Sequence, residues 1–162
     1  MSRSRYLPLL AACLMLGLPS RAALAAATDV EALLALTEPP AGVVFEIVSA
    51  NPRALERTLP QARDAIRRLR ERFPGLPAVI VSHGSEQFAL LQSAAAERPA
   101  VHQAVRSLLS EDDVPVQVCG THAGWRGKRA EEFPDYVGVA VSGPAQINDY
   151  VALGYALVLL RP

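Results

Sequence analysis

The stretch PAVIVS, residues 77–82, decides the fold class of this chain. It is apolar up to its final serine, without the alternation of polar and apolar residues that marks a strand with one solvated face. Such a continuous run is typical of a parallel strand covered on both faces. His83, Gly84 and Ser85 follow, and we expect them to form the turn at which this strand ends.

Segments of the same kind recur along the chain, and helical patterns separate them. Between residues 51 and 73 apolar side chains return every three or four positions, as on one face of a helix, and Pro60 is expected to kink or restart that helix. This alternation predicts an α/β fold, a three-layer α/β/α sandwich with a mainly parallel five-stranded sheet. The other predicted strands cover residues 42–49, 114–119, 136–142 and 155–160. The other predicted helices cover residues 86–92, 101–109, 120–129 and 143–153.

The first 27 residues have the pattern of a cleavable export signal. A short basic start precedes an apolar run over residues 7–19, and the small-residue tract 22–27 follows. A membrane-spanning helix needs ~20 apolar residues, so the pattern predicts a signal peptide and no stable membrane anchor. We expect cleavage after Ala25 or Ala27 and a periplasmic or secreted protein.

The composition fits one globular domain. The 162 residues are 51% apolar, which is too high a fraction for a disordered chain. The 16 basic and 16 acidic side chains balance, whereas nucleic-acid-binding proteins normally carry a basic surplus, so we expect no nucleic-acid partner. The predicted organisation is a signal peptide over residues 1–27, an N-terminal helix or arm over residues 28–41, and an α/β domain over residues 42–162.

Cleavage would leave one cysteine, Cys119, in the exported chain, which is unusual because oxidising compartments tend to pair cysteines. A predicted strand ends at this residue. The carboxyl ends of parallel strands meet at one rim of a sheet, where ligands collect. His83-Gly84 and Ser142-Gly143 follow two other predicted strands, so we expect these residues at the same rim.

Cys119 stands at a strand-to-helix junction, where the free amides of a helix amino-terminus favour a thiolate. His122 would face the sulfur if this segment is helical, and the long side chain of Arg126 would lean back toward it from two turns further on. The alternative is a buried, inert cysteine that ends a core strand, with His83 capping its turn. His102 lies in the polar part of its predicted helix and is assigned no role.

The sequence lacks the common cofactor motifs. It contains no G-x-G pair, no P-loop, no G-x-S-x-G and no H-E-x-x-H. We therefore expect no organic cofactor and no metal. A copper or zinc site formed by Cys119 with His122 or His83 is a further alternative, but the signal is weak because structural zinc takes four ligands.

Three segments match a known family in order and spacing. The dipeptide Val118-Cys119, followed by Arg126-Gly127, is the first. The others are VIVSHG at residues 79–84 and a closing segment with Val141-Ser142-Gly143, Ile147, Gly154-Tyr155-Ala156 and Pro162. Together they resemble the DsrE/DsrF-like family of sulfur-relay proteins, and the resemblance extends over residues 43–162.

The resemblance implies an α/β/α domain that assembles into homo- or hetero-oligomers. It also implies that Cys119 carries sulfur as a persulfide, in sulfurtransferase-like exchange with a sulfur donor or acceptor protein. Arg126 or a protonated His122 would stabilise the terminal sulfur. The alternative within the same fold is a non-catalytic oligomeric binding module with an inert cysteine. The candidate site residues are Cys119, supported by His83, Gly84, His122, Arg126, Gly127, Ser142 and Gly143.

Overall fold

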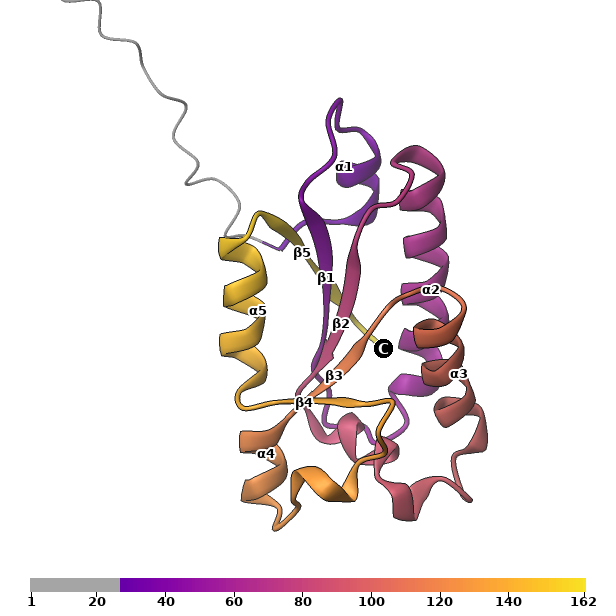
Figure 1. The fold of residues 1–162 in the computed structure, drawn as a ribbon, viewed down its shortest axis with the longest axis vertical. Helices are drawn as coiled ribbons and strands as arrows, with labels where there is room; N and C mark the ends of the chain where they lie inside the picture. The colour runs from indigo at the N-terminus through magenta and orange to yellow at the C-terminus, as the bar shows by residue number, and fades with distance from the viewer. Residues whose placement is uncertain (1–26) are drawn as a thin grey trace, which may run out of the picture.

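A computed structural model describes residues 27–162, so the predicted signal peptide lies outside the described residues except for Ala27. Five strands form one sheet in the order β4-β3-β2-β1-β5, and every neighbouring pair is parallel (Figure 1). This confirms the predicted α/β fold. The strands are β1 (Gly42–Ile47), β2 (Ala78–Ser82), β3 (Val116–Cys119), β4 (Gly138–Ala140) and β5 (Tyr155–Leu160).

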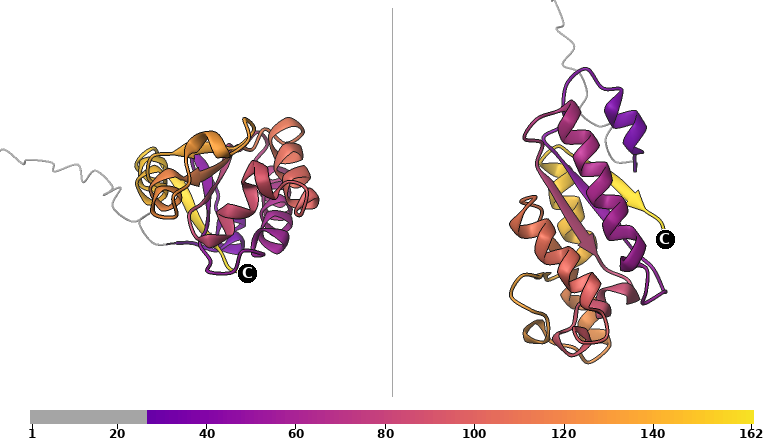
Figure 2. Two further views of the ribbon diagram at one scale, coloured as in Figure 1. Left: turned by 90° about the horizontal axis from the view of Figure 1, so that it is seen from below. Right: turned by 90° about the vertical axis from the view of Figure 1, so that its right-hand side faces the viewer.

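Helices cover both faces of the sheet. The right view of Figure 2 shows α2 and α3 in front of the sheet and α5 behind it. The α-helices are α1 (Val30–Leu34), α2 (Leu55–Arg72), α3 (Pro99–Ser110), α4 (Gly120–Trp125) and α5 (Gly143–Ala152). Short 3₁₀ helices η1 (Ser85–Leu90), η2 (Gln92–Ala94) and η3 (Ala130–Glu132) complete the fold. Within residues 27–162, no helix combines the length and apolar character needed to cross a membrane.

Strand β1 shows how the two faces of the sheet differ. Val43, Phe45 and Ile47 are fully buried in the large apolar core beneath α1, α2 and α3. Val44 faces the other way, into a smaller apolar cluster beneath α5. Glu46 shares this second face, because side chains alternate along a strand. The buried members of the smaller cluster are Val44, Val79, Val81 and Ile147.

Two local predictions are wrong, and a third is made more specific. The helix predicted to reach residue 129 ends at Trp125, because Gly127 adopts a left-handed conformation with φ of 67° that stops helix propagation. The short helix predicted over residues 86–92 is present as the 3₁₀ helices η1 and η2. Helix α2 begins at Leu55 rather than residue 51 and continues through Pro60, which lies inside the helix.

Candidate functional site

The carboxyl ends of three neighbouring strands bring predicted site residues to one pocket. His83 follows β2, Cys119 ends β3 and Ser142 comes shortly after β4. All three line a pocket of 380 Å³, to which His122 of α4 also contributes. The parallel sheet therefore gathers side chains that are far apart in the sequence, as the pattern of strands predicts.

Cys119 is 4% exposed and is the only cysteine among residues 27–162. Its backbone is extended, with φ of −88° and ψ of 110°, and α4 begins at the next residue. Its Sγ atom accepts a hydrogen bond from the His122 N–H at 3.4 Å, so the sulfur caps the helix as a serine or aspartate oxygen commonly does. Its own N–H donates to Oε1 of Gln87 at 2.8 Å. The sulfur is thus fixed at a helix amino-terminus.

The amino-terminus of a second helix, α5, lies against the same cysteine. Ser142 caps α5 by accepting a hydrogen bond from the Ala145 N–H at 3.5 Å. A Cβ atom added at Gly143 would lie 2.7 Å from Cβ of His83 and 3.2 Å from Cβ of Cys119. Glycine at this position therefore allows α5 to approach the pocket closely. The partial positive charge of the α5 amino-terminus favours an anion there.

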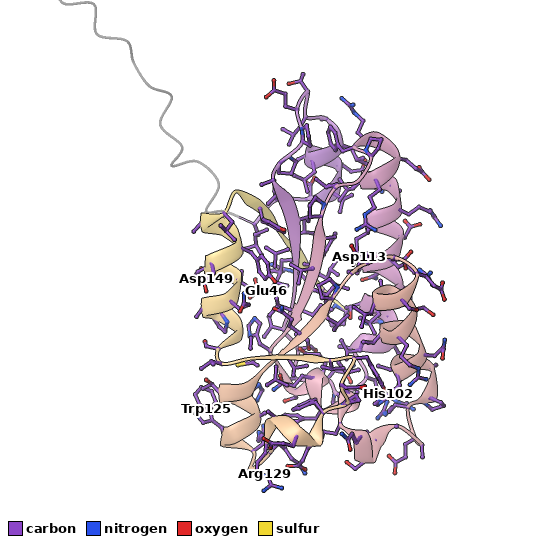
Figure 3. All side chains as sticks on the ribbon, viewed as in Figure 1. Glu46, His102, Asp113, Trp125, Arg129 and Asp149 are labelled. Carbon is purple, nitrogen blue, oxygen red and sulfur yellow. The ribbon has the colours of Figure 1, made fainter. Side chains whose placement is uncertain are left out.

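A carboxylate orients His83. Its Nε2 atom lies 2.7 Å from Oε1 of Glu46, on the face of the sheet beneath α5 (Figure 3). Nδ1 of His122 lies 2.7 Å from the carbonyl oxygen of His83 and must donate to it, because a carbonyl oxygen can only accept. Phe88 packs edge-on against the His122 ring, with ring centroids 5.4 Å apart. Contacts with neighbouring side chains and backbone thus fix both imidazoles.

Sequence analysis missed Glu46, although the residue leaves a signal. It is the only charged side chain in β1, between Phe45 and Ile47, which are both fully buried. A single carboxylate in such a strand needs a partner, because an unpaired buried charge is costly. The nearby histidine of the next strand end supplies that partner.

Sequence analysis also missed a buried carboxylate that ties the strand ends together. Glu86 is fully buried and accepts hydrogen bonds from Ser49 N at 2.7 Å, Ser82 Oγ at 2.8 Å and Gly84 N at 2.9 Å. A Cβ atom at Gly84 would collide with this carboxylate and with the Ser49 backbone. The contribution of Gly84 is therefore steric: it allows the β2 turn to close around Glu86. Gln87, the next residue, holds the Cys119 amide.

The structure does not place Arg126 in the Cys119 pocket. The residue follows α4 directly and lines a neighbouring pocket of 540 Å³. The predicted position two turns along a continuous helix is wrong, because α4 ends one residue earlier. Gly127 reverses the chain behind it. Among the predicted supporting residues, His83, Gly84, His122 and Ser142 line the cysteine pocket and Gly143 packs against it.

Within the described part of the chain, no three His, Cys, Asp or Glu side chains gather closely enough to hold a metal ion. Cys119, His83 and His122 border one pocket, but each has another partner: the His122 N–H, the Glu46 carboxylate and the His83 carbonyl, respectively.

Comparison with solved structures shows the fold. The chain is similar to a protein of unknown function, MTH1491, from Methanobacterium thermoautotrophicum, with a TM-score of 0.56 and 16% identity over 73% of this chain and 97% of that one. It is similar to the ychN protein from E. coli, with a TM-score of 0.56 and 20% identity over 74% of this chain and 98% of that one. It is also similar to a conserved protein of unknown function, BT1422, from Bacteroides thetaiotaomicron. The TM-score is 0.52, and the identity is 11% over 74% of this chain and 95% of that one. No family model and no curated protein matches the chain.

Proposed function

We propose that the protein is an exported, DsrE-like sulfur carrier that binds sulfane sulfur as a persulfide on Cys119. The observation that carries the proposal is the position of this cysteine: it caps α4, contacts the start of α5 and lines a pocket with His83 and His122. The fold shared with the ychN protein agrees with the resemblance to the DsrE/DsrF-like family.

The proposed step is thiol exchange with a donor persulfide. The Cys119 thiolate attacks the outer sulfur of the donor, and a new S–S bond forms between that sulfur and Sγ. The S–S bond of the donor breaks, and its inner sulfur leaves with the electron pair as a thiolate. No external oxidant or reductant is needed, because one S–S bond replaces another. A second exchange would pass the sulfur to an acceptor protein.

The site provides a place for the anionic terminal sulfur. Helix α5 begins beside Cys119 at Gly143, and the positive end of its dipole favours negative charge. His122 holds its Nδ1 hydrogen on the His83 carbonyl. Its Nε2 has no hydrogen-bond partner among residues 27–162, so this atom is available to a ligand. With Nδ1 donating, Nε2 is an acceptor in the neutral ring and a donor only in the protonated ring. Protonated His122 therefore takes the stabilising role that sequence analysis shared between it and Arg126.

One observation favours a second candidate, a non-catalytic oligomeric binding module. Cys119 is only 4% exposed, and buried cysteines are commonly inert. In that case the pocket would bind a ligand without forming a bond to sulfur. The two functions differ in one measurable property, the ability of the thiol to accept sulfur.

The test is mass spectrometry of the exported protein after exposure to inorganic polysulfide. A carrier gains the mass of one or more sulfur atoms on the peptide that contains Cys119, and dithiothreitol removes them. The matched control is Cys119→Ser, which should gain no sulfur. An unmodified thiol in folded protein that becomes modified only after denaturation would refute the carrier function and leave the binding module.

We also propose that the protein is a homo-oligomer. Trp125 is 79% exposed, and Val48, which lines the Cys119 pocket with it, is also exposed. Val141, next to Ser142 of the same lining, is 88% exposed. Apolar side chains this exposed near one pocket are suited to contact with a second copy. Light scattering of the exported chain at micromolar concentration tests this. A mass corresponding to one chain at every concentration would contradict it.

A further inference from the structure

A second pocket adjoins the Cys119 pocket. It has a volume of 540 Å³, and Ala50 and Ser85 line both pockets, so the two are neighbours along a common wall. Phe88, Ala89, Leu91 and Ala94 give it an apolar lining. Its charged residues are Arg98, Arg126, Lys128 and Glu97, three cations against one carboxylate. The pocket thus combines an apolar wall with an excess of positive charge.

Arg126 supplies the charge that the protein itself does not neutralise. Nη1 of Arg98 pairs with Oε1 of Glu56 at 2.5 Å. Nζ of Lys128 pairs with Oε2 of Glu132 at 3.1 Å. Across residues 27–162 no carboxylate lies within ion-pair distance of Arg126. Its guanidinium, which presents several donors in one plane, is therefore available to an external carboxylate.

Backbone hydrogen bonds fix the loop from which the Arg126 side chain extends. The N–H groups of Arg126 and Lys128 both donate to the carbonyl oxygen of Ala123, each at 2.9 Å. The intervening Gly127 makes this possible through its left-handed conformation, and its N–H donates to the Gly124 carbonyl at 2.9 Å. Both basic side chains therefore leave a loop that is tied to the end of α4, the helix that Cys119 caps.

We propose that this pocket binds the carboxylate end of the sulfur donor, a low-molecular-weight organic persulfide, while the sulfane sulfur reaches Cys119. This inference rests on the proposed carrier function and names its substrate class. Arg126 pairs with the donor carboxylate, the apolar wall contacts the carbon chain, and the shared wall at Ala50 and Ser85 leads to the sulfur. Inorganic polysulfide is an anion but has no carboxylate, so it cannot form the paired hydrogen bonds with the Arg126 guanidinium, and the pocket favours the organic donor.

The first experiment measures the rate of sulfur loading on Cys119 from two donors, glutathione persulfide and inorganic polysulfide. In Arg126→Gln the ratio of the organic to the inorganic rate should fall about tenfold, as expected for loss of one charge-assisted hydrogen-bonded pair. The matched control is Arg161→Gln, which removes the same charge from a residue outside both pockets and should keep the wild-type ratio. An unchanged ratio in Arg126→Gln would overturn the assignment.

The second experiment separates this inference from the carrier function. S-methylglutathione carries the carboxylates but cannot transfer sulfur, and calorimetry in a Cys119→Ser background measures its binding alone. Arg126→Gln should weaken this binding about tenfold, and added salt should weaken it in the unsubstituted Arg126 protein. Equal affinity in Cys119→Ser with Arg126 and in Cys119→Ser with Arg126→Gln, or no binding to either protein, overturns the carboxylate site. If neither donor loads Cys119 while Arg126→Gln still weakens binding, the carrier function fails and the carboxylate site stands.

Discussion

The two faces of the sheet are built from different chemistry. Phe45 and Glu46 are neighbours on β1, yet Phe45 lies in the core beneath α1–α3 and Glu46 faces α5. Figure 3 shows Glu46 on the α5 side and His102 on the side of α3. The first face buries a continuous apolar core, whereas the second has four buried apolar residues and the Glu46–His83 pair.

This difference separates stability from the site. Burying one large apolar side chain stabilises a fold by about 1.5–3 kcal/mol, so the α1–α3 face, which has most of these side chains, dominates stability. The α5 face contributes fewer such contacts and keeps polar groups close to the pocket. Substitutions on one face should therefore affect the free energy of unfolding, and substitutions on the other should affect Cys119.

The largest effect is expected for Phe45→Ala. It removes a fully buried ring from the large core and should lower the free energy of unfolding by about 3–5 kcal/mol. Urea unfolding followed by circular dichroism measures this change. In protein that remains folded, the rate of Cys119 alkylation should match wild type. A stability loss below 1 kcal/mol would contradict the assignment of this face as the main core.

A smaller loss of stability, with a larger effect on the reactivity of Cys119, is expected for Gly143→Val. The new side chain would meet His83 and Cys119, so we expect a loss of about 1–3 kcal/mol and a marked change in the rate of Cys119 alkylation by iodoacetamide. The matched control is Gly124→Ala, because a Cβ atom there meets nothing within 4 Å. Alkylation at the same rate in both variants would show that α5 does not approach the sulfur closely.

His102 tests whether a titratable group on the core face acts only on stability. The side chain is 1% exposed, which corrects the expectation of a polar position. Burial lowers its pKa from the ordinary 6.5, and Arg106 adds to the shift. Nε2 donates to the Ala89 carbonyl at 3.0 Å, which partly opposes this shift, and Nδ1 lies 2.6 Å from the Tyr136 hydroxyl, which can donate to the neutral ring.

The sign of the pH dependence follows from this lowered pKa. Between the folded pKa and pH 6.5 the unfolded chain binds a proton that folded His102 does not, so the unfolding free energy should fall as pH drops from 6.5 to the folded pKa. Above pH 6.5 the contribution is fully present. Urea unfolding between pH 5 and 8 should show a weaker slope in His102→Gln than in wild type, on the order of one proton. Identical slopes would mean that His102 does not titrate differently on folding.

The smallest stability effect is expected for Glu46→Gln. The amide keeps the shape and an acceptor for His83, and the pair is partly exposed, so stability should change by less than about 1 kcal/mol. Sulfur loading of Cys119 should nevertheless slow, because His83 loses the negative charge that orients it. The matched control on the other face is Glu111→Gln, which breaks an exposed pair with Arg63 and should leave loading unchanged. Equal loading in both variants would remove Glu46 from the site.

Sequence patterns predicted the strands better than the segments that carry the site. The apolar run at residues 77–82 and the helix-like spacing of α2 are strong signals, because burial on both faces of a sheet leaves few polar positions. The segment after Cys119 has three glycines within eight residues, and its length depends on whether Gly127 takes a left-handed conformation. The sequence does not show which of these glycines ends the helix, and the position of Arg126, in one pocket or the next, depends on it.

The polar partners of the site were missed for a different reason. Glu46 and His83 are 37 positions apart in the sequence, and only the register of β1 against β2 brings them together. Glu86 reads as an ordinary residue of a short helix, yet it accepts three hydrogen bonds from groups of other segments and its own turn. Such pairings leave no periodic pattern, so sequence reasoning predicts the rim but not its hydrogen bonds.

The exposure of Trp125 has a consequence for optical experiments. It is the single tryptophan of the sequence, and it lies at the end of α4, where it is 79% exposed (Figure 3). Its ring centroid lies 6.1 Å from that of His122. An indole that is already in water in the native state changes little in emission wavelength when the sheet unfolds. Anything that covers this edge of the pocket, whether a second copy or a bound molecule, excludes water from the ring and shifts the emission to shorter wavelength. The intrinsic fluorescence of this protein therefore reports on what covers this edge of the pocket, and it reports on unfolding only where unfolding removes that cover.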